Sequence, residues 1–481
     1  FGILLGKLEE VMHLSPRRHL VIYVHNLGYE FSWIQKYFTW DNVFAIKNRR
    51  PVYAISGGIE FRCSYFLSNY SLAYIGDELL QKYPIKKLVG NLDYRKVRHS
   101  ATPLTDKELA YCVNDVKVVM SYIQEKIETD GNITKIPLTN TGYVRNYCRE
   151  ECFTEGVSQL NEEELKKIRL NYRAIMKSLQ VQNDDEYNQL KRGFMGGFTH
   201  TSILYSGIVL DDVGSADLTS SYPYTIVAQY FPMTRFQYIG TVSDPFILKA
   251  LLGRYCCIFD IKFINIKPKI INANYLSISK CFDEYGKAFT KKTMERDHVI
   301  VNNGRLVSAD AVITSMNEID FSLCEDFYTW DEVEIGLCYI YKRGRLPKEI
   351  VEATLDLYAK KTTLKGSTSD YDLDMYQRSK GLLNSCYGMM CQRVVQPIHT
   401  YDNEKGWIVE EKEAESEIKK YNNSKKRFLF YPWSCYVTSI VRMVVCQGLL
   451  AFGDSFQYCD TDSLKVSSMN HGEWYIKAFN E

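Results

Sequence analysis

The segment Tyr458-Cys459-Asp460-Thr461-Asp462-Ser463 constrains this chain more than any other. Two aspartates separated by one residue follow an apolar stretch, which predicts a strand end or a hairpin tip. In a strand, residues i and i+2 point to the same face, so both carboxylates would converge on one point. Such carboxylates repel each other unless a cation lies between them, and Mg²⁺ bound with substrate phosphates uses this arrangement. The alternative is an acidic turn, since Asp and Thr are ordinary turn residues.

Length and composition limit the classes of protein to consider. The 481 residues exceed what one core usually serves, so two or more domains are expected. No run of 18 apolar residues and no basic-then-apolar signal pattern appears, and the chain is expected to have no membrane segment. The 14 cysteines contain no C-x-x-C pair, so neither a zinc site nor a disulfide framework is indicated. A reducing, intracellular compartment is therefore expected. With a net charge of only +1, any nucleic-acid binding must come from local basic stretches.

The first third of the chain predicts an α/β domain. His19–Val24 is typical of a buried strand, polar residues follow at its end, and Ser32–Trp40 is predicted to be helical. Strand ends are where α/β sheets bind ligands. Apolar residues at helical spacing predict a second helix over Leu109–Ile127, and its Tyr111 and Asp115 share a face. The alternative is a solvated Asp beside a half-buried Tyr.

The middle of the chain offers two further candidate sites. Lys191-Arg192-Gly193-Phe194-Met195-Gly196-Gly197-Phe198 joins two cations to paired glycines, which let a backbone approach a phosphate chain closely. A strand over Val213–Leu218 would place Asp217 near its end, before Ser220-Ser221-Tyr222-Pro223 begins a helix. An aspartate there, followed by backbone amides, suits a metal and a triphosphate, and a plain helix cap is the alternative. Residues 183–186 are predicted to be an acidic linker, and 246–340 short β segments.

The last third contains a basic stretch, a polar helix stripe and a charged insertion. Residues 341–365 include Lys361 and six other cations that form a plausible track for phosphates, or a solvated helix face. Lys380, Asn384 and Tyr387 fall on one helical stripe, which suits the reading of a nucleotide. A charged stretch over 391–427 and an apolar helix over Val437–Leu450 precede the Asp-Thr-Asp hairpin.

These motifs resemble those of one family. Asp217-x-x-Ser-Ser-Tyr-Pro, Lys380-x-x-x-Asn-Ser-x-Tyr-Gly and Tyr458-x-Asp-Thr-Asp-Ser have the order and spacing of motifs A, B and C of family B DNA polymerases. The chain is most similar to the protein-primed branch, which includes small bacteriophage and linear-plasmid replicases. That branch has two insertions, and the stretches near 225–340 and 391–427 occupy their places.

The first third resembles the proofreading exonuclease of the same family. The strand with His25-Asn26-Leu27-Gly28-Tyr29-Glu30 and the pair Tyr111-x-x-x-Asp115 are similar to its second and third motifs, although Glu30 stands where the family has Asp. The first motif, Asp-x-Glu, would precede Phe1, and a truncated N-terminus is expected. Asn91-Leu92-Asp93-Tyr94 resembles a segment whose Tyr contacts single-stranded substrate. The lysine that usually precedes that segment has no certain counterpart, with Lys86 and Lys87 nearby.

The resemblance implies a fold class of α/β plus α+β. A ribonuclease-H-like 3′–5′ exonuclease domain would precede a right-hand polymerase with palm and fingers, terminal-protein-region insertions and a missing thumb. The expected segments are exonuclease 1–155, linker and Gly-Gly loop 156–200, palm with motif A 201–224, first insertion 225–340, fingers 341–390, second insertion 391–427 and palm with motif C 428–481.

The resemblance also assigns roles to residues. Asp217 and Asp462 would hold two Mg²⁺ ions, which Mn²⁺ can replace, with Asp460 as the third catalytic carboxylate. Tyr111 joins Glu30 and Asp115 in the exonuclease site, and these two carboxylates would hold its metals. The expected nucleotide contacts are Tyr222, Lys361, Lys380, Asn384 and Tyr387. The expected DNA contacts are His25, Asn26, Tyr29, Tyr94, Gly196, Gly197, Ser220, Gly388 and Thr461.

The implied function is template-dependent dNTP addition by a monomer. Its partners would be template and primer DNA, dNTPs and a terminal protein as primer, with synthesis that displaces a strand. The expected location is the host cytoplasm, bacterial for a phage, or a mitochondrion or cytoplasm for a linear plasmid. Two alternatives stay open: a family B polymerase primed by nucleic acid, and a non-catalytic DNA-binding fragment.

Overall fold

The chain folds into two compact units. The computed structural model describes residues 2–88, 95–99, 101–154, 161–366 and 370–481, without the side chains of 370–375, 377, 378 and 384. Unit 1 comprises 1–147, 359–382 and 395–413, and unit 2 comprises 148–358, 383–394 and 414–481. The boundary between the units therefore falls inside three helices: α6 (Asn140–Thr154), α13 (Lys348–Thr363) and α14 (Asp370–Met390).

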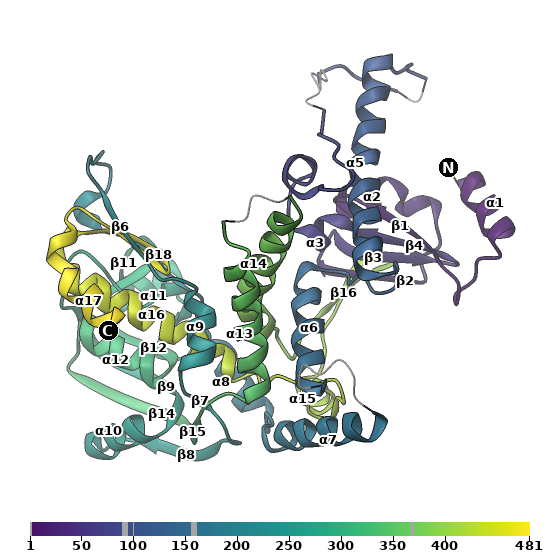
Figure 1. The fold of residues 1–481 in the computed structure, drawn as a ribbon. Helices are drawn as coiled ribbons and strands as arrows, with labels where there is room; N and C mark the ends of the chain where they lie inside the picture. Colours follow the sequence, from purple (N-terminus) through teal and green to yellow (C-terminus); the bar gives the residue numbers. More distant parts are fainter. Residues whose placement is uncertain (1, 89–94, 100, 155–160, 367–369) are drawn as a thin grey trace. The chain divides into compact units, whose positions relative to one another are not determined.

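Unit 1 is built on a six-stranded sheet of order β1-β4-β3-β2-β16-β17. Only the β1–β4 pair is parallel, and all the other neighbours run antiparallel. The last two strands come from a segment more than 300 residues further along the chain, and Figure 1 shows β16 at the side of the sheet where β2 lies. The strands are β1 (Leu20–Val24), β2 (Asn42–Lys47), β3 (Arg50–Ser56), β4 (Ile59–Cys63), β16 (Ile398–Asp402) and β17 (Gly406–Glu410).

Helices surround this sheet. The longest, α5, begins with a capping box in which Thr105 and Glu108 satisfy each other's backbone N–H groups, and it ends at Gly131, whose φ of 86° suits glycine. Its buried face includes Val118, Tyr122 and Ile123. The helices of unit 1 are α1 (Gly2–Met12), α2 (Leu27–Ile34), α3 (Ser64–Ser68), α4 (Leu72–Tyr74) and α5 (Asp106–Asp130).

Unit 2 contains three further sheets. The largest has the order β10-β12-β9-β14-β8, with β11 on β12 and β13 on β9, and its two central strands each span 13 residues. A four-stranded sheet of order β5-β18-β19-β6 carries the aspartate hairpin. The strands are β5 (Phe198–Thr201), β6 (Gly214–Asp217), β7 (Phe231–Pro232), β8 (Gln237–Val242), β9 (Cys256–Pro268), β10 (Cys281–Phe282), β11 (Ile300–Asn302), β12 (Arg305–Asn317), β13 (Tyr328–Thr329), β14 (Glu332–Tyr341), β15 (Arg343–Gly344), β18 (Phe456–Thr461) and β19 (Ser463–Val466).

Helix α16 (Trp433–Phe452) is the central helix of unit 2, and apolar residues from it and from both larger sheets form one continuous core. By length and composition Trp433–Ser455 is the one segment of the described chain apolar enough to cross a membrane, yet 72% of it is buried within the structure, as in a core helix. The other helices are α7 (Glu162–Ser178), α8 (Asp184–Gly193), α9 (Ser221–Ala228), α10 (Pro245–Arg254), α11 (Lys291–Arg296), α12 (Glu318–Phe327), α15 (Ala414–Asn423) and α17 (Glu473–Asn480).

Several predicted elements are confirmed, including the strand before His25, the helices around Asp115, Tyr387 and Val441, and the aspartate hairpin. Three predictions are wrong. The helix expected from Ser32 begins at Leu27, so Glu30 lies on a helix. Residues 183–186 are not a linker, because Asn183 caps α8 and the acidic first turn complements the helix dipole. The stretch 246–340 holds two long strands and three helices, not only short β segments.

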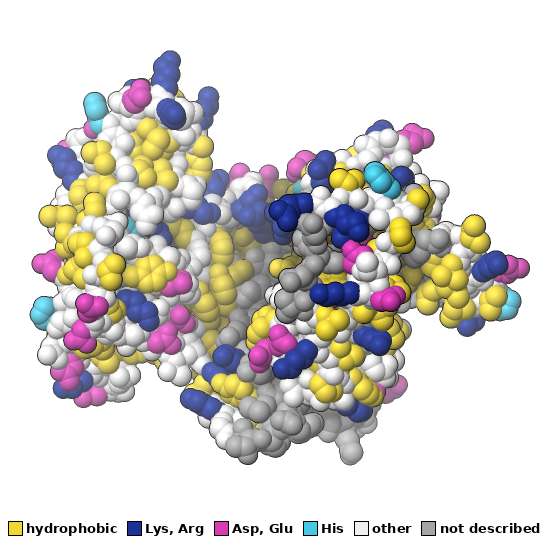
Figure 2. Space-filling view, turned by 90° about the horizontal axis from the view of Figure 1, so that it is seen from above, with side chains coloured by type: hydrophobic (Ala, Val, Ile, Leu, Met, Phe, Trp, Pro, Cys, Tyr) yellow, Lys and Arg dark blue, Asp and Glu magenta, His cyan; other side chains and the backbone are white. Residues whose placement is uncertain are grey.

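Charges of both signs are interspersed on the surface seen in Figure 2, in agreement with the net charge of +1. The candidate site is therefore identified from its local geometry.

Candidate active site

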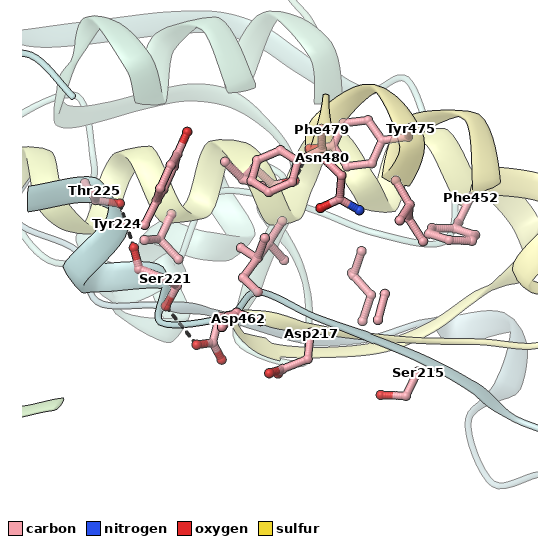
Figure 3. Close-up of a pocket in the computed structure, with 18 of the residues that line it drawn as sticks. Ser215, Asp217, Ser221, Tyr224, Thr225, Phe452, Asp462, Tyr475, Phe479 and Asn480 are labelled. Carbon is pink, nitrogen blue, oxygen red and sulfur yellow. Dashed lines mark hydrogen bonds between the residues drawn. The ribbon is translucent and has the colours of Figure 1, made fainter. Parts of the chain in front are cut away.

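The aspartate hairpin lies beside Asp217. Strand β19 pairs with β18 on one side and with β6 on the other, so that Ser463 is opposite both Asp460 and Asp217. The N–H of Leu218 donates to the carbonyl of Asp462 at 2.9 Å. Asp462 occupies the turn itself, after Thr461 in a left-handed conformation with φ 58°. Two segments almost 250 residues apart in sequence thus bring Asp217 and Asp462 together, as Figure 3 shows.

The two hairpin carboxylates differ in their surroundings. Asp460 is exposed and accepts hydrogen bonds from the hydroxyls of Thr199 at 3.2 Å and Thr461 at 3.1 Å. Asp462 is partly buried and accepts one from Ser221 Oγ at 2.8 Å. Burial raises the pKa of Asp462, and the neighbouring charge of Asp217 raises it further, against the opposing Ser221 hydrogen bond.

These carboxylates fit a hard divalent cation. Within the described residues, no group of three or more Asp, Glu, His or Cys side chains is gathered as a metal cluster. Asp217, at the end of β6, and Asp462, in the adjacent turn, nevertheless supply oxygen donors. Burial and, to a smaller extent, the charge of Asp217 raise the pKa of Asp462, and a bound cation would favour its charged form. A few carboxylates that leave room for substrate phosphates are the donor set that Mg²⁺ uses.

A stacked pair of tyrosines comes from the predicted nucleotide-binding motifs. Ser220 is left-handed with φ 55°, and the turn it makes lets α9 begin directly after β6. The ring of Tyr222 then stacks on the ring of Tyr387 from α14, with centroids 4.2 Å apart and planes 9° from parallel. Burial, together with the charge of Asp462, raises the pKa of Tyr222 to about 12, so its hydroxyl is neutral at physiological pH.

The other predicted nucleotide contacts are divided between the units. Lys361 and Lys380 belong to unit 1, where Lys380 is exposed and Lys361 is half-buried. Gly388 is exposed on α14 in unit 2. The side chain of Asn384 lies outside the described part of the chain.

The paired glycines pack against the aspartate hairpin. A Cβ on Gly197 would lie 2.8 Å from Thr461 Oγ1, so only glycine permits this approach. Arg442 Nη1 donates to the carbonyls of Met195 and Gly196 at 2.6 and 2.7 Å, which fixes the backbone of the loop.

A small cationic pocket of about 160 Å³ adjoins this loop. Lys280 and Arg305 line it with Gly196 and Gly197. Burial, reinforced by nearby arginines, lowers the pKa of Lys280, and burial lowers that of Arg305. Partly desolvated cations of this kind favour an anionic ligand, such as a phosphate group. Sequence reasoning missed both residues, because they lie far from any recognisable motif.

An apolar cavity of about 500 Å³ lies behind the aspartates. Asp217 and Asp462 line one wall, and Figure 3 shows Phe452, Tyr475 and Phe479 around the cavity on the other side of the strands. The carboxylates therefore have polar surroundings on one side and an apolar wall on the other.

In unit 1, the second predicted site gathers around α5. Lys87 Nζ donates to Tyr111 OH at 2.7 Å and lies 3.5 Å from Asp115 Oδ1. Although burial lowers the pKa of Lys87, its hydrogen bond to Tyr111 and the charge of Asp115 raise it overall. Of the two neighbouring lysines that the sequence offered, Lys87 is the one whose ammonium contacts Tyr111 and Asp115. His25 Nδ1 lies 3.1 Å from Ser64 Oγ, and burial lowers the pKa of His25.

The remaining predicted residues of this site lie on or before α2. Asn26 precedes the helix in a left-handed conformation with φ 62°. Tyr29 and Glu30 are exposed on the helix. A pocket of about 500 Å³ is lined by His25, Asn26 and the consecutive cations Arg49 and Arg50. Tyr94 lies outside the described residues.

The comparisons with known proteins agree with this geometry. The family model for organellar and viral type B DNA polymerases matches residues 40–480. Bacteriophage phi29 DNA polymerase complexed with single-stranded DNA has a similar fold, with TM-score 0.67 and 15% identity over 96% of this chain and 74% of that one. The same enzyme complexed with primer-template DNA and incoming nucleotides gives TM-score 0.59 and 16% identity over 93% and 71%. No curated protein matches the sequence.

Proposed function

The chain belongs to the organellar and viral type B DNA polymerases and is a DNA-directed DNA polymerase, and we propose that it replicates DNA from a protein primer with the aspartate hairpin as its active site. The pairing of β6 with β19, which sets Asp217 beside Asp462, is the observation that carries this proposal. The non-catalytic alternative is disfavoured because these carboxylates, the paired glycines and the tyrosine stack lie within one unit.

Asp217 and Asp462 would hold two Mg²⁺ ions, or Mn²⁺ in their place. When bound, such ions activate the primer hydroxyl and stabilise the leaving pyrophosphate. Ser221 orients Asp462 through its hydroxyl, and Thr199 and Thr461 hold Asp460, which contributes negative charge from a more exposed position.

The tyrosine stack would select the nucleotide. Tyr222 is held flat against Tyr387. Its ring would lie under the sugar of the incoming nucleotide and exclude a 2′-hydroxyl. Tyr387 and Asn384 would monitor the nascent base pair, while Lys361 and Lys380 would bind the triphosphate as point charges. The Tyr222 ring would exclude the 2′-hydroxyl of a ribonucleotide by its volume. Because this requires the ring to stay fixed, the selection depends on the Tyr222–Tyr387 stack remaining in place.

The Gly-Gly loop would guide DNA to the hairpin. No heavy atom lies within 4 Å of the position that a Cβ on Gly196 would take, so a phosphate chain can approach the backbone there. Lys280 and Arg305 supply positive charge in the adjoining pocket. Ser220 and Gly388 are further proposed contacts along this path.

Unit 1 would provide a 3′–5′ exonuclease. Glu30 and Asp115 are the proposed metal ligands, with Tyr111 and Lys87 beside Asp115. The proposed contacts to single-stranded DNA are His25, Asn26, Tyr29 and Tyr94. The pocket beside His25, with its two arginines, is suited to a phosphate chain.

Priming by a terminal protein is proposed from the two insertions. The first, near 225–340, supplies the long strands β9 and β12, which share the core of unit 2, and the second, 391–427, supplies the β16–β17 hairpin. A polymerase primed by nucleic acid needs neither insertion. The enzyme is proposed to act as a monomer with strand displacement, in the cytoplasm of its host or in a mitochondrion.

Protein priming is tested with the natural full-length protein, a candidate terminal protein, template and labelled dNTP. The expected product is a covalent protein–nucleotide adduct that needs a divalent cation and is lost in Asp462→Ala. A matched reaction with a DNA primer measures polymerisation independently. Extension of the DNA primer without any protein adduct would assign the enzyme to the nucleic-acid-primed branch.

A further inference from the structure

The hairpin formed by β16 and β17 belongs structurally to unit 1, although it lies between the second and third polymerase motifs in sequence. Strand β16 pairs with β2 where His399 faces Ala45, and it extends the sheet that bears β1. A segment expected to act in processivity and strand displacement is therefore packed against the elements of the proposed exonuclease site.

The turn of the hairpin holds the chain after α2 with two hydrogen bonds. The N–H of Trp40 donates to Asn403 Oδ1 at 2.8 Å, and Asn403 Nδ2 donates to the Trp40 carbonyl at 2.9 Å. One amide side chain thus satisfies both backbone groups of one residue, as a paired strand would. Trp40 Nε1 donates in turn to the carbonyl of Gln35, directly after α2.

An aromatic cluster joins the hairpin to α2 itself. The ring of Phe31, which is only 1% exposed, lies 4.9 Å from Trp40 and 5.3 Å from both Tyr401 and Trp407, measured between centroids. Phe31 is adjacent in sequence to Glu30, which points to solvent from the same helix. The hairpin rings therefore set the rotation of the helix that carries the carboxylate.

The other contact of α2 is equally tight. A Cβ on Gly28 would lie 2.8 Å from the carbonyl oxygen of Arg49, so the start of the helix rests directly on the β2–β3 turn. With Gly28 against that backbone and Phe31 against the hairpin, α2 has little freedom to turn. A carboxylate that shifts by about 1 Å can lose roughly a hundredfold in rate.

We propose that the β16–β17 hairpin positions Glu30 for exonuclease catalysis, with Asn403 as the positioning residue and Tyr401 and Trp407 as its support. This inference rests on the exonuclease activity proposed above. Proofreading would then depend on a segment inserted in the polymerase sequence, and changes in the hairpin would alter editing without touching a metal ligand.

The test uses Asn403→Asp in the full-length protein, which keeps the shape of the side chain but removes its N–H donor and places a charge against the Trp40 carbonyl. Asn423→Asp is the control, since it makes the same change at an exposed position of the same insertion. We expect the exonuclease kcat to fall roughly tenfold to a hundredfold. The KM for single-stranded DNA should stay unchanged, and the Mg²⁺ concentration needed for the half-maximal exonuclease rate should rise. The rate of single-nucleotide incorporation should be unchanged.

A second pair of variants separates positioning from general destabilisation. Trp407→Ala should reproduce the loss, and Trp407→Phe should restore most of the rate because it keeps a ring against Phe31. Hydrogen exchange provides a readout without activity: amides of Leu27–Ile34 should exchange about tenfold faster in Asn403→Asp.

Each outcome is decisive. An unchanged exonuclease kcat and Mg²⁺ requirement, or a loss confined to KM, would overturn the inference. The exonuclease proposal itself fails if the unmodified enzyme does not degrade single-stranded DNA, or if Asp115→Asn does not abolish that degradation. The proposed positioning of Glu30 for catalysis then fails with it. Hydrogen exchange then shows whether the hairpin still restrains α2.

Discussion

The aspartate hairpin of unit 2 and the cluster of Lys87, Tyr111 and Asp115 in unit 1, called the corner below, both present carboxylates. They differ in the protein groups that contact those carboxylates. Among the described residues, Asp217, Asp460 and Asp462 form no ion pair, and the hydrogen-bond donors to the carboxylates of Asp460 and Asp462 are hydroxyls. Asp115 lies 3.5 Å from the Lys87 ammonium. The hairpin carboxylates therefore have no cationic side chain of the described protein to compensate their charge, whereas the charge of Asp115 is partly compensated by Lys87.

The largest effect is expected when one carboxylate of the hairpin loses its charge. Asp462→Asn keeps the Ser221 contact and the shape of the turn but removes the charge that would bind metal. Nucleotide incorporation should fall by roughly a thousandfold, since several kcal/mol of charge stabilisation are lost. Primer extension measures the fall, and exposed Asp211→Asn is the control. Near-normal extension with Mg²⁺ would exclude Asp462 as a ligand.

The second prediction removes the cation from the corner. Lys87→Met should lower the exonuclease rate by roughly tenfold to a hundredfold, as for other residues that orient metal ligands. Tyr111 and Asp115 lose the group that holds both of them, while polymerisation in unit 2 should continue unchanged. Degradation of a labelled single strand is the measurement, with exposed Lys86→Met as the matched control. Equal losses in both variants would mean that general positive charge, not the Lys87 contact, matters.

The same comparison shows what could be predicted from sequence. The hairpin was predictable because Asp460, Asp462 and Asp217 lie at strand ends with strong local patterns, and pairing between strands brings them together. Lys87 could not be chosen over Lys86, because no local pattern determines which lysine meets α5. Ser221 was within a quoted motif, but its bond to Asp462 depends on the left-handed turn at Ser220. The addition of β16 to the first sheet depends on pairing across more than 300 residues, which leaves no local signal.

A third prediction concerns how hydroxyls organise the hairpin. Ser221→Ala removes the only side-chain hydrogen bond found for Asp462 in the described structure. Incorporation should fall about tenfold, and the Mg²⁺ needed for half-maximal rate should rise, because outer-shell partners orient metal ligands. Exposed Ser206→Ala should have no effect. A lower rate with an unaltered Mg²⁺ requirement would show that Ser221 acts on the helix start instead of the metal site.

The smallest expected effect tests whether burial distinguishes the two hairpin carboxylates. Thr199→Val keeps the branched shape of a strand residue but removes a 3.2 Å hydrogen bond to Asp460. Because Asp460 is exposed and also accepts from Thr461, water can replace the lost donor. A hydrogen bond contributes about 1 kcal/mol at most sites and less where solvent competes, so incorporation should change by about twofold or less. Single-turnover rates of Thr199→Val and Ser221→Ala, measured side by side over a Mg²⁺ series, decide the matter. If the two variants lose activity equally, the exposed Asp460 organises metal as strictly as the partly buried Asp462, and the two hairpin carboxylates must be treated as equivalent ligands.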